Sequence, residues 1–124
     1  MPRPAPASFR SALVTCRQVR DDILPLLAAR AFADESRSFA MHALDSDALV
    51  TSLTALLARQ SDWAPVIAGL CADSLRRLAD DLPENSWPAE RRPSILDAAV
   101  QLERLGNGWL GTPKDEPTGG PYAA

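Results

Sequence analysis

The chain has 124 residues, of which 46% are hydrophobic and 23% charged, and its formal net charge at pH 7 is −3. This length corresponds to one domain, and the hydrophobic content is sufficient for a buried core. The negative charge argues against a protein that coats nucleic acids in general, and no apolar run is long enough to cross a membrane.

Basic residues are concentrated at the start of the chain. Residues 1–20 contain four arginines and no acidic residue, so a basic segment precedes an acidic body. The spacing of Arg10, Arg17 and Arg20 places them along one flank of a helix, where they could contact phosphates. A regulator that binds nucleic acid is therefore one alternative for the function. We expect these arginines instead to pair with acidic residues or to contact a protein partner.

The first helical element is predicted over residues 9–33, where apolar residues keep a helical spacing. Ser8 is expected to cap its start. Pro25 interrupts the pattern three residues after Asp22, an acidic residue that could cap a second helix. We therefore predict a kink or a break at 22–25.

Residues 34–45 are mostly polar and predict only one or two helical turns before the next helix. They include His42, the only histidine, which lies close to Asp45 and Asp47. A small enzyme or a metal site around His42 is thus a second alternative, because such a trio could hold a metal ion or polarise an imidazole base. Since the chain shows no further convergent ligands, we predict a structural role for His42 and expect no catalytic residue, metal or cofactor.

Two apolar helices, over 46–60 and 62–82, form the centre of the predicted fold. From residue 48 to residue 72 the only charged residues are Arg59 and Asp62, and both lie in the turn between the helices. A helix at the surface of a protein normally has a charged outer face, and these two have none over that length. We predict an antiparallel helical hairpin whose outer surface needs to be covered.

Acidic and hydroxyl side chains at 45–47 are expected to cap the first hairpin helix, and Asp62 the second, with Pro65 in its first turn. Each helix also carries a stripe of large apolar residues that is expected to face the core. These residues are Leu49, Val50, Leu53, Leu56 and Leu57 in the first helix and Trp63, Ile67, Leu70, Cys71, Leu75, Leu78 and Leu82 in the second.

A stripe of small, uncharged residues runs beside the large one in both hairpin helices. It can be covered by another helix of the chain, by a second copy or by a different protein, and we favour a homodimer. The residues predicted for this contact are Thr51, Thr54, Ala55, Ala58, Ala64, Ala68 and Ala72.

The last helix is predicted over 94–105, with Ser94 as its cap and a glycine-containing end at 106–108. Three prolines at five-residue intervals make the preceding connection irregular, and this connection contains Trp87. Trp109 and Leu110 follow the helix, and one of them is expected to fold back onto it. We include both tryptophans among the candidate partner contacts.

Taken by composition, the chain divides into a proline-rich extended start (1–7), a helical domain (8–110) and a tail without a core-forming pattern (111–124), flexible or docked. Cys16 and Cys71 lie on apolar stripes and far apart in sequence, so we expect buried free thiols. Together with the absence of a signal-peptide pattern, they favour the cytoplasm.

The sequence thus predicts an all-α, single-domain bundle of four to five helices around a central antiparallel hairpin. The expected function is a non-enzymatic module that acts by protein–protein contact. Adaptors, chaperones, immunity proteins and inhibitors of larger machines encoded by phages or plasmids all belong to this class, and the sequence does not separate them.

Overall fold

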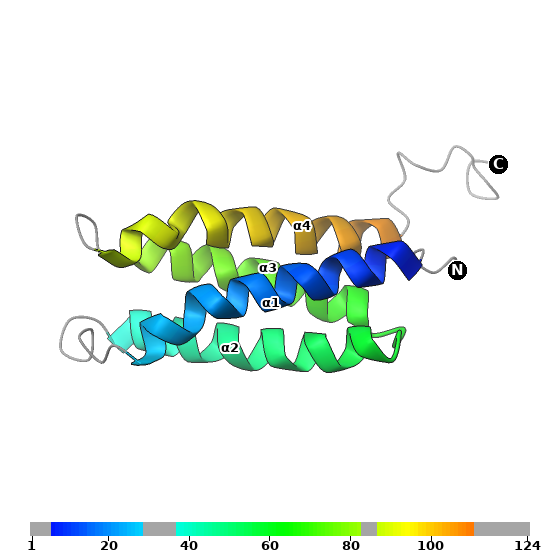
Figure 1. Ribbon diagram of the computed structural model, residues 1–124, viewed down its shortest axis with the longest axis horizontal. Coiled ribbons are helices and arrows are strands. Elements are labelled where there is room, and N and C mark those ends of the chain that lie inside the picture. The colour runs from blue at the N-terminus through cyan, green and yellow to red at the C-terminus, as the bar shows by residue number, and fades with distance from the viewer. Residues whose placement is uncertain (1–5, 29–36, 83–86, 111–124) are drawn as a thin grey trace.

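The computed structural model describes residues 6–28, 37–82 and 87–110 and shows a bundle of four α-helices. In chain order the elements are α1 (Pro6–Ala28), α2 (Arg37–Ala58), α3 (Ala64–Asp81), the 3-10 helix η1 (Trp87–Arg91) and α4 (Arg92–Leu110). Successive α-helices run in opposite directions (Figure 1), and α1 and α3 each pack against both α2 and α4. The all-α bundle around an antiparallel hairpin of α2 and α3 confirms the predicted fold class.

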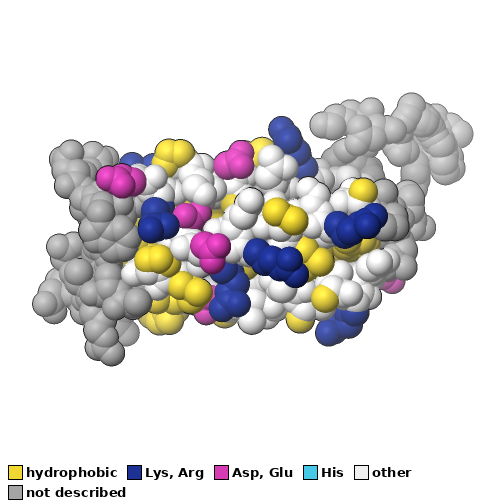
Figure 2. Space-filling model, in the orientation of Figure 1, with side chains coloured by type: hydrophobic (Ala, Val, Ile, Leu, Met, Phe, Trp, Pro, Cys, Tyr) yellow, Lys and Arg dark blue, Asp and Glu magenta, His cyan; other side chains and the backbone are white. Residues whose placement is uncertain are grey.

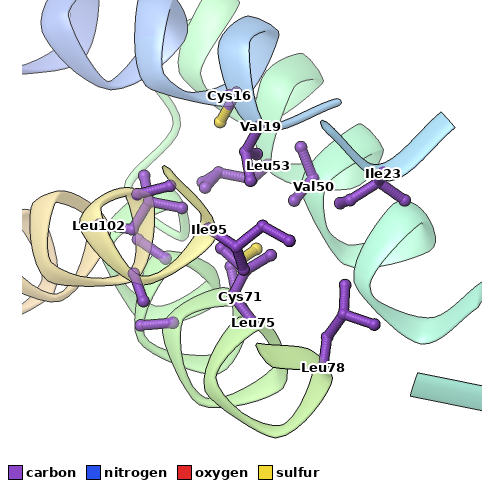
Figure 3. Packing of buried hydrophobic residues seen from close by; sticks show 14 of the residues in the cluster. Cys16, Val19, Ile23, Val50, Leu53, Cys71, Leu75, Leu78, Ile95 and Leu102 are labelled. Atoms are coloured by element: carbon purple, nitrogen blue, oxygen red, sulfur yellow. The ribbon is translucent and has the colours of Figure 1, made fainter. Parts of the chain in front are cut away.

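The core lies along the axis of the bundle and receives side chains from all four α-helices. Figure 3 shows Val19 of α1, Leu53 of α2, Leu75 of α3 and Ile95 of α4 directed into the same interior. Each of the four is at most 1% exposed. Burying a side chain of this size stabilises the fold by roughly 1.5–3 kcal/mol, so the shared stripe accounts for the association of the helices. In the described ranges 6–28, 37–82 and 87–110, no helix is both long and apolar enough to cross a membrane.

The first helix differs from the prediction at its start and in its middle. It begins at Pro6, two residues before Ser8, because a proline is well tolerated in the first turn of a helix. It then continues through Pro25 without a break. Only three residues of α1 follow this proline, so its missing N–H group removes one hydrogen bond near the helix end. The predicted part beyond Ala28 lies outside the described residues.

Asp22 has a different role from the predicted helix cap. Its carboxylate accepts a hydrogen bond of 2.6 Å from Ser94 Oγ and one of 3.1 Å from the Arg91 guanidinium. Ser94 was itself expected to cap the last helix, but α4 begins two residues earlier, at Arg92. The two short polar side chains therefore join α1 to the start of α4 instead of closing helix ends.

The second helix begins at Arg37, so the predicted start near residue 46 is wrong. The polar run at 45–47 lies inside α2, where neighbouring helices supply its partners. Ser46 is buried and shares a hydrogen bond of 2.8 Å with Ser74 of α3. The carboxylate of Asp47 lies 3.5 Å from the Arg20 guanidinium of α1. Ser46 thus has a hydrogen-bond partner outside its own helix, whereas Asp47 Oδ1 and Arg20 Nε are buried as an ion pair without a hydrogen bond.

The hairpin turn closes α2 with two backbone hydrogen bonds, from Gln60 N–H to the Leu57 carbonyl and from Ser61 N–H to the Leu56 carbonyl. This pair of bonds is the Schellman arrangement, and it requires a left-handed residue. Gln60 occupies that position with φ 52°. The next helix is capped by Trp63 without a side-chain bond, so the predicted cap at Asp62 is wrong.

α4 follows η1 directly and is anchored to the end of α3. The Arg92 guanidinium donates hydrogen bonds of 3.0 Å to the carbonyl oxygens of Ala79 and Leu82. These carbonyls belong to the carboxyl end of α3, where a cation also complements the helix dipole. The connection is thus more regular than predicted, although residues 83–86 lie outside the described part.

The far end of α4 also departs from the prediction, because the helix continues through Gly106 to Leu110. A Cβ atom at Gly106 would lie 3.0 Å from the Pro65 carbonyl oxygen. The glycine therefore permits close contact with the first turn of α3, and it does not end the helix. Of the extended start predicted over 1–7, residues 6 and 7 are helical, while residues 1–5 and the tail at 111–124 are outside the described residues.

Candidate protein-binding surface

The small stripe of α3 is internal in the structure, and two residues of its large stripe are exposed. Ala64, Ala68 and Ala72 are at most 1% exposed, whereas Trp63 is 67% and Leu70 52% exposed. Small side chains let helices approach closely, so the alanine stripe packs inside the bundle. Of the large stripe, Cys71, Leu75, Leu78 and Leu82 are buried as predicted, whereas Trp63 and Leu70 lie at the surface. The prediction that these alanines meet a partner is corrected: they are covered by the chain's own helices.

On α2 the small uncharged residues mostly stay at the surface. Thr51, Ala55 and Ala58 are exposed, and Thr54 is half-buried. The hydroxyl of Thr54 donates a hydrogen bond of 2.8 Å to the Val50 carbonyl of its own helix. The predicted contact face therefore does not exist as one surface, because its α2 half is exposed and its α3 half is internal.

A different surface arises along the outer junction of α2 and α3, which we call the hairpin seam. It is uncharged over its length and combines a stripe of small residues on α2 with a stripe of large residues on α3. The small stripe consists of Ala48, Ser52 and Ala55, and the large stripe of Trp63, Val66 and Leu70. Between the stripes lie three partly buried residues that pack against the core, Leu49, Leu56 and Ile67.

The seam widens into a groove of about 530 Å³ at the end away from the hairpin turn. Its apolar wall includes Leu49 and Leu70, and charged side chains surround its mouth. Asp45 comes from α2, while Asp73 and Arg77 come from α3 and form an exposed ion pair of 3.3 Å within that helix. The apolar centre is thus bordered by charge, which is the usual composition of a protein interface.

His42 also lines this groove, but its partner is neither of the predicted aspartates. Its Nδ1 atom lies 2.6 Å from Asp81 Oδ2, so the imidazole joins α2 to the end of α3. Asp47 is occupied by the ion pair with Arg20. Among the described residues, no group of three His, Cys, Asp or Glu side chains is placed to hold a metal ion. The geometry around His42 is that of a tertiary hydrogen bond.

The basic flank of α1 is divided by the structure. Arg10 and Arg17 are exposed, whereas Arg20 is half-buried beside Asp47. Figure 2 shows the face that carries α1, where basic side chains are spread among acidic and hydrophobic ones. This mixed surface lacks the continuous basic patch that a phosphate backbone attracts.

Both cysteines are buried core residues. Burial raises the pKa of the Cys16 thiol to about 11 and that of the Cys71 thiol to about 12, because a thiolate is costly in an apolar interior. The predicted free thiols are confirmed among the described residues, and their chemistry is suppressed by burial. The side chains of Trp87 and Trp109, the other two candidate partner contacts, are not among those that the structure describes.

No protein-family model matches the chain, and no curated protein or solved structure matches it either. The functional assignment therefore depends on the surface. Sequence reasoning did not single out Val66 and assigned Trp63 and Leu70 to the core. The signal that could have identified these three residues is the scarcity of charge from residue 48 to residue 72. Helices without a charged face must expose some uncharged or apolar side chains to water.

Proposed function

We propose that this protein is a non-enzymatic helical module that acts by binding another protein chain through the hairpin seam. The observation that carries the proposal is the exposure of Trp63 and Leu70 beside an uncharged surface of α2. A single exposed leucine is ordinary, but a continuous apolar strip along two helices is typical of an interaction site.

The seam has the residue types that contribute most to binding energy. A large aromatic side chain, Trp63, stands at one end, and Leu70 faces the groove at the other. In protein interfaces, tryptophan is enriched among the residues whose truncation to alanine costs about 2 kcal/mol or more of binding free energy. The scaffold beneath is held by buried leucines and by the Ser46–Ser74 hydrogen bond, so the strip is presented on rigid helices.

The other two functions considered from the sequence receive less support. Among the described arginines of the predicted flank, nucleic-acid binding would depend on Arg10 and Arg17, since Arg20 forms an ion pair with Asp47. An enzyme centred on His42 would need a nucleophile or a second convergent group besides Asp81. We therefore favour the class of adaptors, chaperones, immunity proteins and inhibitors, with the cytoplasm as the proposed location because both thiols are free.

Comparative affinity capture from cells tests this proposal. The baits are the wild-type protein, Leu70→Arg in the seam, and Leu96→Arg as a matched control on α4, where Leu96 is 36% exposed. We expect the wild type and the control to retain the same bound protein, a second copy of the chain included, and Leu70→Arg to lose it. Equal retention by all three folded baits would contradict a role of the seam.

A further inference from the structure

We propose that the occupant of the hairpin seam is a second copy of this chain, related by a two-fold axis parallel to the helices. In this dimer α3 of each copy lies on α2 of the other. The inference rests on the proposed function of the seam and adds the identity and orientation of the partner.

Two contacts show which residues of the antiparallel hairpin lie at the same height. His42 meets Asp81 at 2.6 Å, and Ser46 meets Ser74 at 2.8 Å. Continuing this register toward the turn places Ser52 level with Leu70. The hairpin turn itself holds Arg59 and Asp62 at the other end.

Opposite charges at the groove end of the seam meet under this symmetry. Asp45 and Arg77 line the same groove, and the register given by the His42–Asp81 and Ser46–Ser74 contacts places them level on neighbouring helices. A two-fold axis parallel to the helices brings each α2 over the α3 of the other copy at equal height. Asp45 then faces Arg77 of the second copy, where the guanidinium lies between Asp45 and Asp73, its ion-pair partner in the same helix.

Side-chain size supports the same orientation. The small stripe on α2 offers space where the large stripe on α3 projects, and the symmetry places Leu70 of one copy over Ser52 of the other. Self-complementary pairing of this kind is what an isologous interface requires. A two-fold axis perpendicular to the helices would place large residues over large and small over small. That alternative leaves the small stripes uncovered.

Charge exchange tests the pairing. Asp45→Arg places a basic group opposite Arg77 of the other copy, and Arg77→Asp places an acidic group opposite Asp45 of the other copy. Each variant should therefore dimerise at least about tenfold more weakly than the wild type. An equimolar mixture of the two variants restores both ion pairs in a heterodimer. The double variant Asp45→Arg/Arg77→Asp restores them within a homodimer. Sedimentation velocity measures the mass of each species against the 13.4 kDa chain.

Matched controls come from α4, where Asp97→Arg and Arg104→Asp change exposed charges that lie off the seam. We expect the wild type and both controls to sediment as dimers, each seam variant alone as a monomer, and the mixture and the double variant as dimers. Circular dichroism verifies that every variant retains its helical content.

Three results would overturn the inference. A monomeric wild-type protein at tens of micromolar, roughly the range in which weak homodimers form, excludes the second copy. If a partner is nevertheless captured in a Leu70-dependent manner, the proposed function stands and only this inference fails. Rescue of Asp45→Arg by Arg59→Asp, instead of by Arg77→Asp, excludes the parallel axis. Monomers in the mixture and in the double variant exclude the ion pair itself.

Discussion

Leu53 and Leu70 both belong to the large apolar stripes that the sequence assigns to the core. Their truncation to alanine should nevertheless lower the free energy of unfolding by very different amounts. Leu53 is fully buried, at 0% exposure, between α1 and the hairpin. Leu53→Ala removes three buried carbon atoms and leaves a cavity, which costs about 2–5 kcal/mol of unfolding free energy. Leu70 is 52% exposed, so about half of its surface already contacts water. Leu70→Ala leaves no enclosed cavity and should cost at most about 1 kcal/mol.

The assay is urea unfolding followed by circular dichroism, with the free energy extrapolated to water for the wild type and both variants. Protein concentration is kept low enough for the monomer to dominate, because association would add to the apparent stability. Equal losses for the two variants, or a larger loss for Leu70→Ala, would refute the outward orientation of Leu70. The description of the seam would then fail with it.

Three further predictions follow from the core and the helix contacts. Gly69→Ala should stabilise the fold by about 0.5–1 kcal/mol, since a Cβ there meets nothing within 4 Å. Gly106→Ala should be less stable than Gly69→Ala by about 1–3 kcal/mol in thermal melts, because its Cβ approaches the α3 backbone. Burial raises the pKa of Cys16 to about 11 and that of Cys71 to about 12, above the ordinary thiol value of 9.0, so the thiols of the unfolded chain lose their protons first as the pH rises. Their contribution to stability is therefore full below pH 9 and is lost as the pH rises through 11 and 12, and a chain with both cysteines replaced by alanine should lack that loss. Cys16→Ser should leave self-association measured on the folded protein within a few fold, because this residue is buried on α1 away from the seam, and abolished association would contradict the placement of the interface.

The sequence was sufficient for the fold class and for the hairpin because apolar spacing reports burial directly. Leu53, Leu75 and Ile95 lie on apolar stripes and are buried in the structure. The hairpin turn lies at residues 59–62, the position that the isolated charges Arg59 and Asp62 indicated. Helix ends were less predictable. Ser46 resembles a cap in sequence, yet its hydroxyl is satisfied by Ser74, 28 positions away, and no local pattern contains that contact.

The candidate surface was predictable in kind but not in its residues. The lack of charge from 48 to 72 indicated an outer face in need of cover, and the exposed seam has that property. Gly106 permits close contact between α4 and the first turn of α3, because a Cβ there would lie 3.0 Å from the Pro65 carbonyl oxygen, and this contact between distant residues is not visible in the spacing along α3. Spacing along one helix places Ala68 and Leu70 on different faces, and only the neighbouring helix decides which face is buried.

The fluorescence of Trp63 tests the central claim most directly, because this side chain is 67% exposed in the single chain and lies on the seam. The measurement uses a protein in which Trp87 and Trp109 are replaced by phenylalanine, so that all tryptophan emission comes from Trp63. We predict an emission maximum typical of exposed tryptophan at nanomolar concentration and a shift to shorter wavelength as the concentration rises and a second copy covers the seam. Leu70→Arg should abolish the shift. Emission that is already at short wavelength in the dilute protein, or that remains at long wavelength at every concentration, would contradict an exposed seam that is closed by association.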